Sequence, residues 1–220
     1  MDGLTFKIEA SEFSRTELWA AMGYRGAVPD SNVMDISERL IEELVPAARL
    51  RYMFRIVEAE KISPKQVSFE GKTFNPGGII GSYLNGMTHA CVFVATAGRE
   101  FDSELKALSL QGDIVADFIA DSIGSVLAEV AVSRLESELG LDSHLSLPYS
   151  PGYCGWDIRE QHEFFKFFPP EPCGIRLSES SLMTPEKSIS GFFAMGDNLM
   201  RQPYHCEICQ NKKCYKRKNG

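Results

Sequence analysis

The feature that most constrains the fold is a pair of neighbouring apolar segments in the middle of the chain. Between Asp113 and Leu139 apolar residues recur at helical spacing, which predicts the longest helix of the chain, closed by Gly140. Shortly before it, "ACVFVATAG" at residues 90–98 is continuously apolar and rich in β-branched residues. Such a run is typical of a strand covered on both faces. The chain therefore contains a fully buried strand followed by a long packing helix.

The other predicted elements follow no regular strand–helix alternation. Strands are expected at residues 4–9 and 49–60, the second with Leu50, Tyr52, Phe54 and Ile56 on one face, and a small hairpin at residues 67–74. Helices are expected from Ser14, from Asp30 or Ser31, and around residues 101–108. The mixed order favours an α+β fold with a mixed or antiparallel sheet and packed helices.

Composition and charge exclude several classes of protein. The net charge is −7, so the overall field repels nucleic acid and anionic membranes. No apolar run approaches the roughly 20 residues that span a bilayer. The first residues carry acidic side chains and resemble no secretory signal. We expect a cytoplasmic protein that binds neither nucleic acid nor membrane.

The segment "PYSPGYCGWDIREQHEFFKFF", residues 148–168, combines a constrained loop with the start of a helix. Proline and glycine fix the backbone and would hold Tyr153 in one direction. Asp157 and Glu160 have capping-box spacing, and the free N–H groups of a helix start suit a carboxylate or phosphate. The loop is either a ligand loop or an ordinary tight connection with Tyr153 packed on the core.

A second motif, "GIRLSESSLMTPEKSISGFF" at residues 174–193, reads as two strands joined by the "MTPEKS" turn. Together with the preceding loop it resembles the activation domain of cobalamin-dependent methionine synthase. The matching positions of this motif are Gly174, Leu177, Ser178, Glu179, Ser180, Met183, Pro185, Ser188, Ser190 and Gly191. The resemblance covers roughly residues 90–196, and more weakly the first ninety residues, which resemble small stand-alone relatives of the domain.

The resemblance implies a function. Domains of that family bind S-adenosylmethionine and dock over a cobalamin domain, so that oxidised cobalt can be reduced and remethylated. It implies an accessory role toward a corrinoid protein or methionine synthase, in which the cofactors carry the chemistry. The ligand-binding residues it implies are Gly152 and Tyr153 in the loop, Glu179 and Ser180 in a strand beside it, and Asp121 and Glu129 on the long helix.

Two departures from the family pattern affect the predicted ligand site. The family has an arginine, a partner for the ligand carboxylate, where this chain has Pro148, and a glutamate where it has Ser125. Arg159 and Arg176 are candidates to replace the arginine. A ligand-binding module without a link to cobalamin is a further hypothesis. No serine or cysteine has a partnered base at readable spacing, so hydrolase chemistry has no support.

The cysteines give a separate hypothesis. We divide the chain into an amino-terminal α/β portion at residues 1–90, an activation-domain-like core at 91–200 and a basic tail at 201–220 that holds Cys206, Cys209 and Cys214. Three thiolates at this spacing suit zinc or an iron–sulfur cluster if a fourth ligand joins them. The chain would then be a redox accessory protein, and the alternative is a reduced thiol tail. Cys91 is expected in the core.

Overall fold

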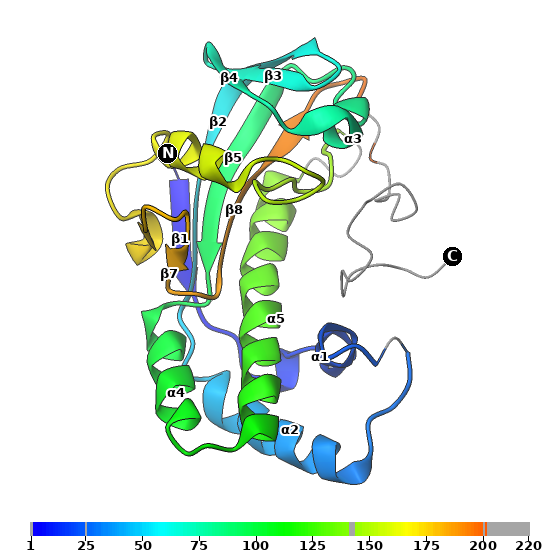
Figure 1. Ribbon diagram of the computed structural model, residues 1–220. Helices are drawn as coiled ribbons and strands as arrows, with labels where there is room; N and C mark the ends of the chain where they lie inside the picture. Colours follow the sequence, from blue (N-terminus) through cyan, green and yellow to red (C-terminus); the bar gives the residue numbers. More distant parts are fainter. Residues whose placement is uncertain (1, 25, 141–143, 200, 202–220) are drawn as a thin grey trace.

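The computed structural model describes residues 2–24, 26–140, 144–199 and 201 (Figure 1). Its strands are β1 (Asp2–Phe6), β2 (Leu50–Ser63), β3 (Gln66–Phe69), β4 (Lys72–Phe74), β5 (His89–Thr96), β6 (Arg176–Leu177), β7 (Met183–Thr184) and β8 (Ser188–Met195). Its helices are η1 (Ala10–Glu12), α1 (Arg15–Ala21), α2 (Ser31–Leu44), α3 (Gly77–Ser82), α4 (Arg99–Ser109), α5 (Ile114–Leu139), η2 (Ile158–Glu160), α6 (Gln161–Phe165) and η3 (Pro172–Gly174). None of the helices within these residues is long and apolar enough to cross a membrane.

The predicted α+β fold is confirmed, and the sheet is antiparallel. The main sheet has the order β4-β3-β2-β5-β8, and β1 pairs with the first part of β2. The strands β6 and β7 form a separate two-stranded sheet. Figure 1 shows α5 running along the main sheet, with α1, α2 and α4 gathered at one end and the β3–β4 hairpin at the other.

Each face of the main sheet has its own core. On one face α1, α2, α4 and α5 pack against side chains that include Leu50, Phe93 and Phe193. On the other face the β3–β4 hairpin, α3 and the segment from residue 149 to 175 cover Val92 and Phe192, among others. The buried pattern of β5 confirms the prediction of a strand covered on both sides.

The long strand β2 differs from the prediction in one respect. Leu50, Tyr52 and Phe54 lie in the core on the helical face, as expected. Ile56, however, is 48% exposed, and the next residue, Val57, is buried in the core on the opposite face. The buried side chains change from one face of this 14-residue strand to the other, because its two halves are covered by different layers. The first half packs under the helices and the second under the hairpin.

The cap residues at several helix ends were predicted correctly. The side chains of Ser14 and Asp30 accept hydrogen bonds from the first-turn N–H groups of α1 and α2, as predicted. Asp113, predicted only as the start of the helical pattern, caps α5 in the same way. Gly140 ends α5 in the left-handed conformation. These caps use local signals, which explains why the sequence was enough to place them.

The segment "CGIRLSESS" at residues 173–181 was predicted wrongly as a single strand. Only Arg176 and Leu177 are in strand conformation, and they pair with β7 rather than with β8. Cys173 and Ser181 have positive φ values of 53° and 65°, which break the extended chain on both sides. Glu179 and Ser180 consequently lie in the turn between β6 and β7 and not in a strand.

Candidate functional site

The loop at residues 148–156 is tied to the edge strand β8. Tyr149 and Phe192 exchange both main-chain hydrogen bonds, at 3.0 and 2.9 Å. The loop then closes on itself, because the Gly152 N–H donates to the Trp156 carbonyl at 2.9 Å and the Trp156 N–H donates to the Tyr153 carbonyl at 2.8 Å. Gly152 has φ 94°, which other residues rarely adopt. Tyr153 is presented at the surface, 44% exposed.

A glycine of the second motif lies directly under this loop. A Cβ atom at Gly191 would be 2.6 Å from the Tyr149 carbonyl oxygen and 2.9 Å from Ser150 Oγ. No side chain fits there unless the loop moves. The two segments on which the family resemblance depends are therefore in direct contact through Tyr149 and Gly191, which are some forty residues apart in the sequence.

Below the loop lies an aromatic layer that fixes its position. The Trp156 ring makes edge contacts with Phe74, Phe164 and Phe192. The loop residue Tyr149 stacks on Tyr83 of the same core, with ring centroids 6.3 Å apart and an interplanar angle of 11°. Burial raises the pKa of Tyr149 above its usual range, so the phenol is neutral at physiological pH.

The carboxylate of Glu160 links the loop to the residue that follows the β3–β4 hairpin. Glu160 accepts three hydrogen bonds, from Trp156 Nε1 at 2.7 Å and from the main-chain and side-chain nitrogens of Asn75, both at 2.9 Å. The capping-box prediction is thus half right. Asp157 accepts from the Arg159 N–H as a cap should, but Glu160 is directed to the hairpin instead of the helix start.

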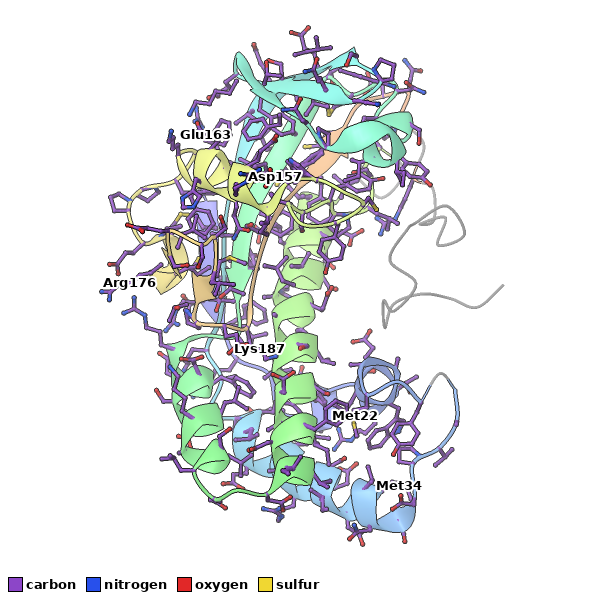
Figure 2. The ribbon with its side chains drawn as sticks, viewed as in Figure 1. Met22, Met34, Asp157, Glu163, Arg176 and Lys187 are labelled. Atoms are coloured by element: carbon purple, nitrogen blue, oxygen red, sulfur yellow. The ribbon has the colours of Figure 1, made fainter. Side chains whose placement is uncertain are left out.

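The polar face of α5 carries a lysine from the β7–β8 turn. Lys187 Nζ lies 2.6 Å from Asp121 Oδ1 and 3.2 Å from Ser125 Oγ. Figure 2 labels Lys187 beside the middle of α5. Glu129 lies two turns further along the same helix and is half-buried. The predicted residue Asp121 therefore belongs to a charged cluster that includes Lys187, which sequence reasoning missed.

Gly124 is the signal that could have revealed Lys187. A glycine in the interior of a helix is unfavourable and often marks a close approach. A Cβ at this position would be 2.7 Å from Lys187 Cγ and 2.5 Å from a ring carbon of Phe101. The glycine makes room for the lysine stem between α5 and α4.

Between the loop and Lys187, no described strand pairs with the outer edge of β8, and Ser190 on this edge is buried, 3% exposed. Successive residues of a strand point their N–H and C=O groups to alternate sides. Since those of Phe192 point outward to Tyr149, those of Ser190 point outward as well. The bridges along this edge join Leu145 to Met195 and Tyr149 to Phe192, and no described segment pairs with Ser190 there.

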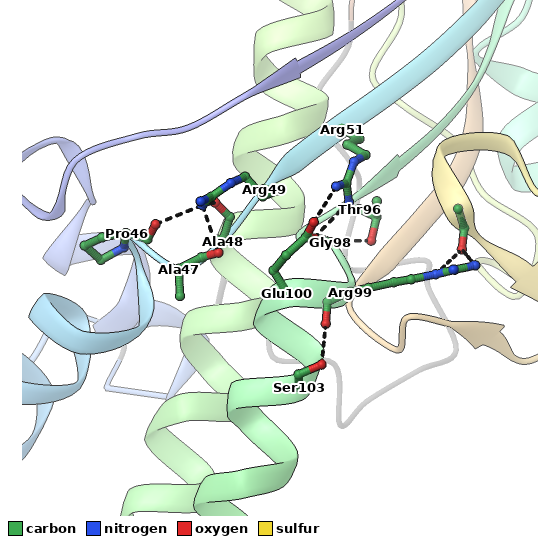
Figure 3. A network of polar contacts seen from close by, with 11 residues as sticks. Pro46, Ala47, Ala48, Arg49, Arg51, Thr96, Gly98, Arg99, Glu100 and Ser103 are labelled. Atoms are coloured by element: carbon green, nitrogen blue, oxygen red, sulfur yellow. Dashed lines mark hydrogen bonds and ion pairs between the residues drawn. The ribbon is translucent and has the colours of Figure 1, made fainter.

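The junction between β5 and α4 positions the second motif (Figure 3). Gly98 begins α4, and Arg51 forms an ion pair with Glu100 at 2.6 Å. The first helical residue, Arg99, donates to the Gly174 carbonyl at 2.7 Å and to Glu171 at 3.1 Å. These contacts hold the start of the second motif against α4.

The two arginines that were candidates to replace the family arginine are held within their own segments. Arg159 contacts Asp157 at 2.5 Å, and Arg176 contacts Glu171 at 2.7 Å. Asp157 has a pKa lowered to about 2 by its hydrogen bonds with Arg159, which shows how closely the two are associated. Both arginine side chains are largely exposed, and neither is anchored at the loop.

The predicted metal ligands Cys206, Cys209 and Cys214 lie outside the described residues. Among the residues that are described, no group of three or more histidine, cysteine, aspartate or glutamate side chains could hold a metal ion. Cys91 is buried in the core as expected, and burial raises the pKa of its thiol to about 12.

Comparison with known proteins places the fold. No family model matches the sequence, and no curated protein matches it. Among solved structures, the chain is similar to the crystal structure of the MetH reactivation domain bound to AdoHcy, with a TM-score of 0.64 and 12% identity. The match covers 93% of this chain and 81% of that one. At this identity the likeness shows a shared fold, and it supports at the level of fold the resemblance that the two motifs indicate.

Proposed function

We propose that the chain is an accessory domain that binds S-adenosylmethionine or a related adenosyl ligand and assists the reactivation of a corrinoid protein. The solved structure that shares its fold is a reactivation domain with AdoHcy bound. A shared fold alone does not establish a function. The proposal therefore depends on the local structure of the loop.

The observation that carries the proposal is the docking of the loop on the second motif. Tyr149 pairs with Phe192, Gly191 leaves space for the loop, and Tyr153 is left at the surface. The main chain of this turn is fixed by its contacts with β8, and the Tyr153 ring is exposed to solvent. Such an arrangement is preorganised to stack on a flat ring such as adenine.

Within this proposal the ligand residues are Gly152 and Tyr153 in the loop, with Asp121 and Glu129 on α5. Glu179 and Ser180 lie in an exposed turn, where Ser180 Oγ contacts Ser178 Oγ at 2.9 Å, and they take no part in the ligand site as we propose it. The role of the ligand-loaded domain is to bind and orient, while the corrinoid supplies the redox and methyl-transfer chemistry.

The test is calorimetric titration of anaerobically purified protein with S-adenosylmethionine and with S-adenosylhomocysteine. We expect saturable binding, weakened about 3–10-fold by Tyr153→Ala because an aromatic contact is lost. The matched control is Tyr24→Ala, a tyrosine that lines an apolar hollow between α1, α2 and α5. Absence of binding for both ligands at millimolar concentration would overturn the proposal.

The corrinoid link is tested separately. A corrinoid protein loaded with cobalamin should elute together with this chain in gel filtration, followed by the visible absorbance of the corrinoid. Ligand binding without such association would overturn the corrinoid link and favour the hypothesis of a ligand-binding module without a link to cobalamin.

A further inference from the structure

Lys187 is fixed at its main chain and along its side chain. Its carbonyl accepts hydrogen bonds from the Ala97 N–H at 2.9 Å and from Thr96 Oγ1 at 3.2 Å. Its stem runs over Gly124, and its side chain is only 11% exposed. The ammonium group is therefore held in one position before any ligand arrives, which lowers the entropic cost of binding.

Both members of the ion pair between Lys187 and Asp121 can form further hydrogen bonds. An ammonium group has three protons, and Lys187 uses two of them on Asp121 and Ser125. The third has no acceptor among the described residues. Asp121 is 53% exposed, so one side of its carboxylate faces solvent. The cluster presents a positive and a negative group side by side.

The Asp121–Lys187 pair lies where the far end of an elongated ligand bound at the loop would lie. Lys187 directly precedes β8, and the loop is bonded to β8 at Phe192. From Ser188 to Phe192 the strand rises about 13 Å. A nucleoside stacked on Tyr153 with an extended amino-acid tail would run along the outer side of β8, over the surface of the buried Ser190, toward Lys187.

We propose that the Asp121–Lys187 pair is the site that recognises the zwitterionic amino-acid end of the ligand. The ligand carboxylate accepts the third proton of Lys187, and the ligand ammonium donates to Asp121. Lys187 then supplies the cation that this chain lacks at Pro148. The inference extends the proposed function and depends on it, since it assumes that an adenosyl ligand binds at the loop.

The chain contains a second lysine–aspartate pair that serves as a matched control. Lys106 contacts Asp102 at 2.7 Å, one turn apart on α4. Its side chain is 72% exposed, and it is not anchored to β8. Lys106→Met removes a similar ion pair and leaves Asp102 in place, so the hydrogen bond that Asp102 accepts from the Glu186 N–H at 3.4 Å is kept.

The experiment compares two probes that differ in the amino-acid end. S-Adenosylhomocysteine carries the zwitterion and 5′-methylthioadenosine lacks it. We expect Lys187→Met, which keeps the unbranched stem, and Asp121→Asn each to weaken S-adenosylhomocysteine binding about 10-fold or more, the effect of losing one charge-assisted hydrogen bond. Methylthioadenosine binding should change less than about 2-fold, and Lys106→Met should change neither.

The outcomes separate this inference from the proposed function. If the wild-type protein binds both probes equally well, or if Lys187→Met weakens both to the same degree, the inference is overturned while adenosyl binding stands. If the wild-type protein binds neither probe, both are overturned. Circular dichroism and thermal melting of each variant establish that the protein is folded, and Asp121→Asn provides an independent reading should Lys187→Met fail to fold.

Discussion

Replacing Gly191 by alanine tests the contact between the two motifs. The added Cβ would lie 2.6 Å from the Tyr149 carbonyl oxygen, 2.9 Å from Ser150 Oγ and 3.2 Å from a ring carbon of Phe93. The nearest of these atoms belongs to the main chain and cannot rotate away. The loop must therefore shift, and the two hydrogen bonds between Tyr149 and Phe192 must lengthen or break.

The magnitude follows from these contacts. Overpacking in a well-packed region costs about 1–3 kcal/mol. Two weakened hydrogen bonds add about 0.5–1.5 kcal/mol each. Alanine regains about 0.5–1 kcal/mol of the backbone entropy that glycine loses on folding. We expect Gly191→Ala to lower the free energy of unfolding by about 1–5 kcal/mol, equivalent to a fall in Tm of roughly 2–20 °C for a chain of this size.

Urea denaturation and thermal melting measure this loss of stability, provided that the m-value in urea is the same for the variant and the wild type. The matched control is Gly78→Ala in α3, where the nearest neighbour of the added Cβ among the described residues is Cγ of the flexible Lys65 side chain at 3.9 Å. That variant should be neutral or slightly stabilised, since alanine favours a helix. Equal stability of the Gly191→Ala and Gly78→Ala proteins would refute the claim that the loop rests tightly on β8.

Three further predictions follow from the site and the cysteines. Glu160→Gln loses at least one of its three donors and should lower the free energy of unfolding by about 1–3 kcal/mol, measured in urea; an unchanged midpoint would contradict the described network. Burial raises the pKa of the Cys173 thiol from 9.0 to about 11 in the folded protein. As pH rises above about 9, the unfolded chain therefore loses the thiol proton before the folded protein does. The contribution of the protonated thiol to stability is thus complete below pH 9 and lost toward pH 11, and the stability difference between wild type and Cys173→Ser should shrink over that window; a constant difference would refute it. If Cys206, Cys209 and Cys214 bind a metal, anaerobically purified protein contains about one zinc ion or one cluster per chain, which a triple serine variant lacks, and wild-type protein without stoichiometric metal would exclude the redox accessory hypothesis.

The parts of the fold that the sequence predicted are those encoded by local pattern. The bounds of β5 and α5 follow from an apolar run and a helical period, and Gly140 marks the end of α5 by cap chemistry. The change of face along β2 at Ile56 was not predictable, because it depends on which layer covers each half of the strand. Nothing in the strand itself carries that information.

The site was predicted in part for the same reason. The proline and glycine residues of the loop identified Gly152 and Tyr153 as a fixed turn. Glu160 has the spacing of a local cap, but its partner Asn75 is 85 residues away. Lys187 sits in a charged turn that looks like an ordinary solvated segment, and only the folded chain brings it to α5, 62 residues earlier. Contacts of this kind have no local signature.

The pairing of β5 with β8 also determines when the chain can fold during synthesis. Thr96 pairs with Ser188, so about ninety residues must be made between the two strands of one ladder. Until β8 leaves the ribosome, β5 has an unpaired apolar edge, and the loop at residues 148–156 has no strand on which to dock. We expect slow folding dominated by this late, long-range closure. Chains interrupted before residue 188 would then be exposed to aggregation and to capture by chaperones.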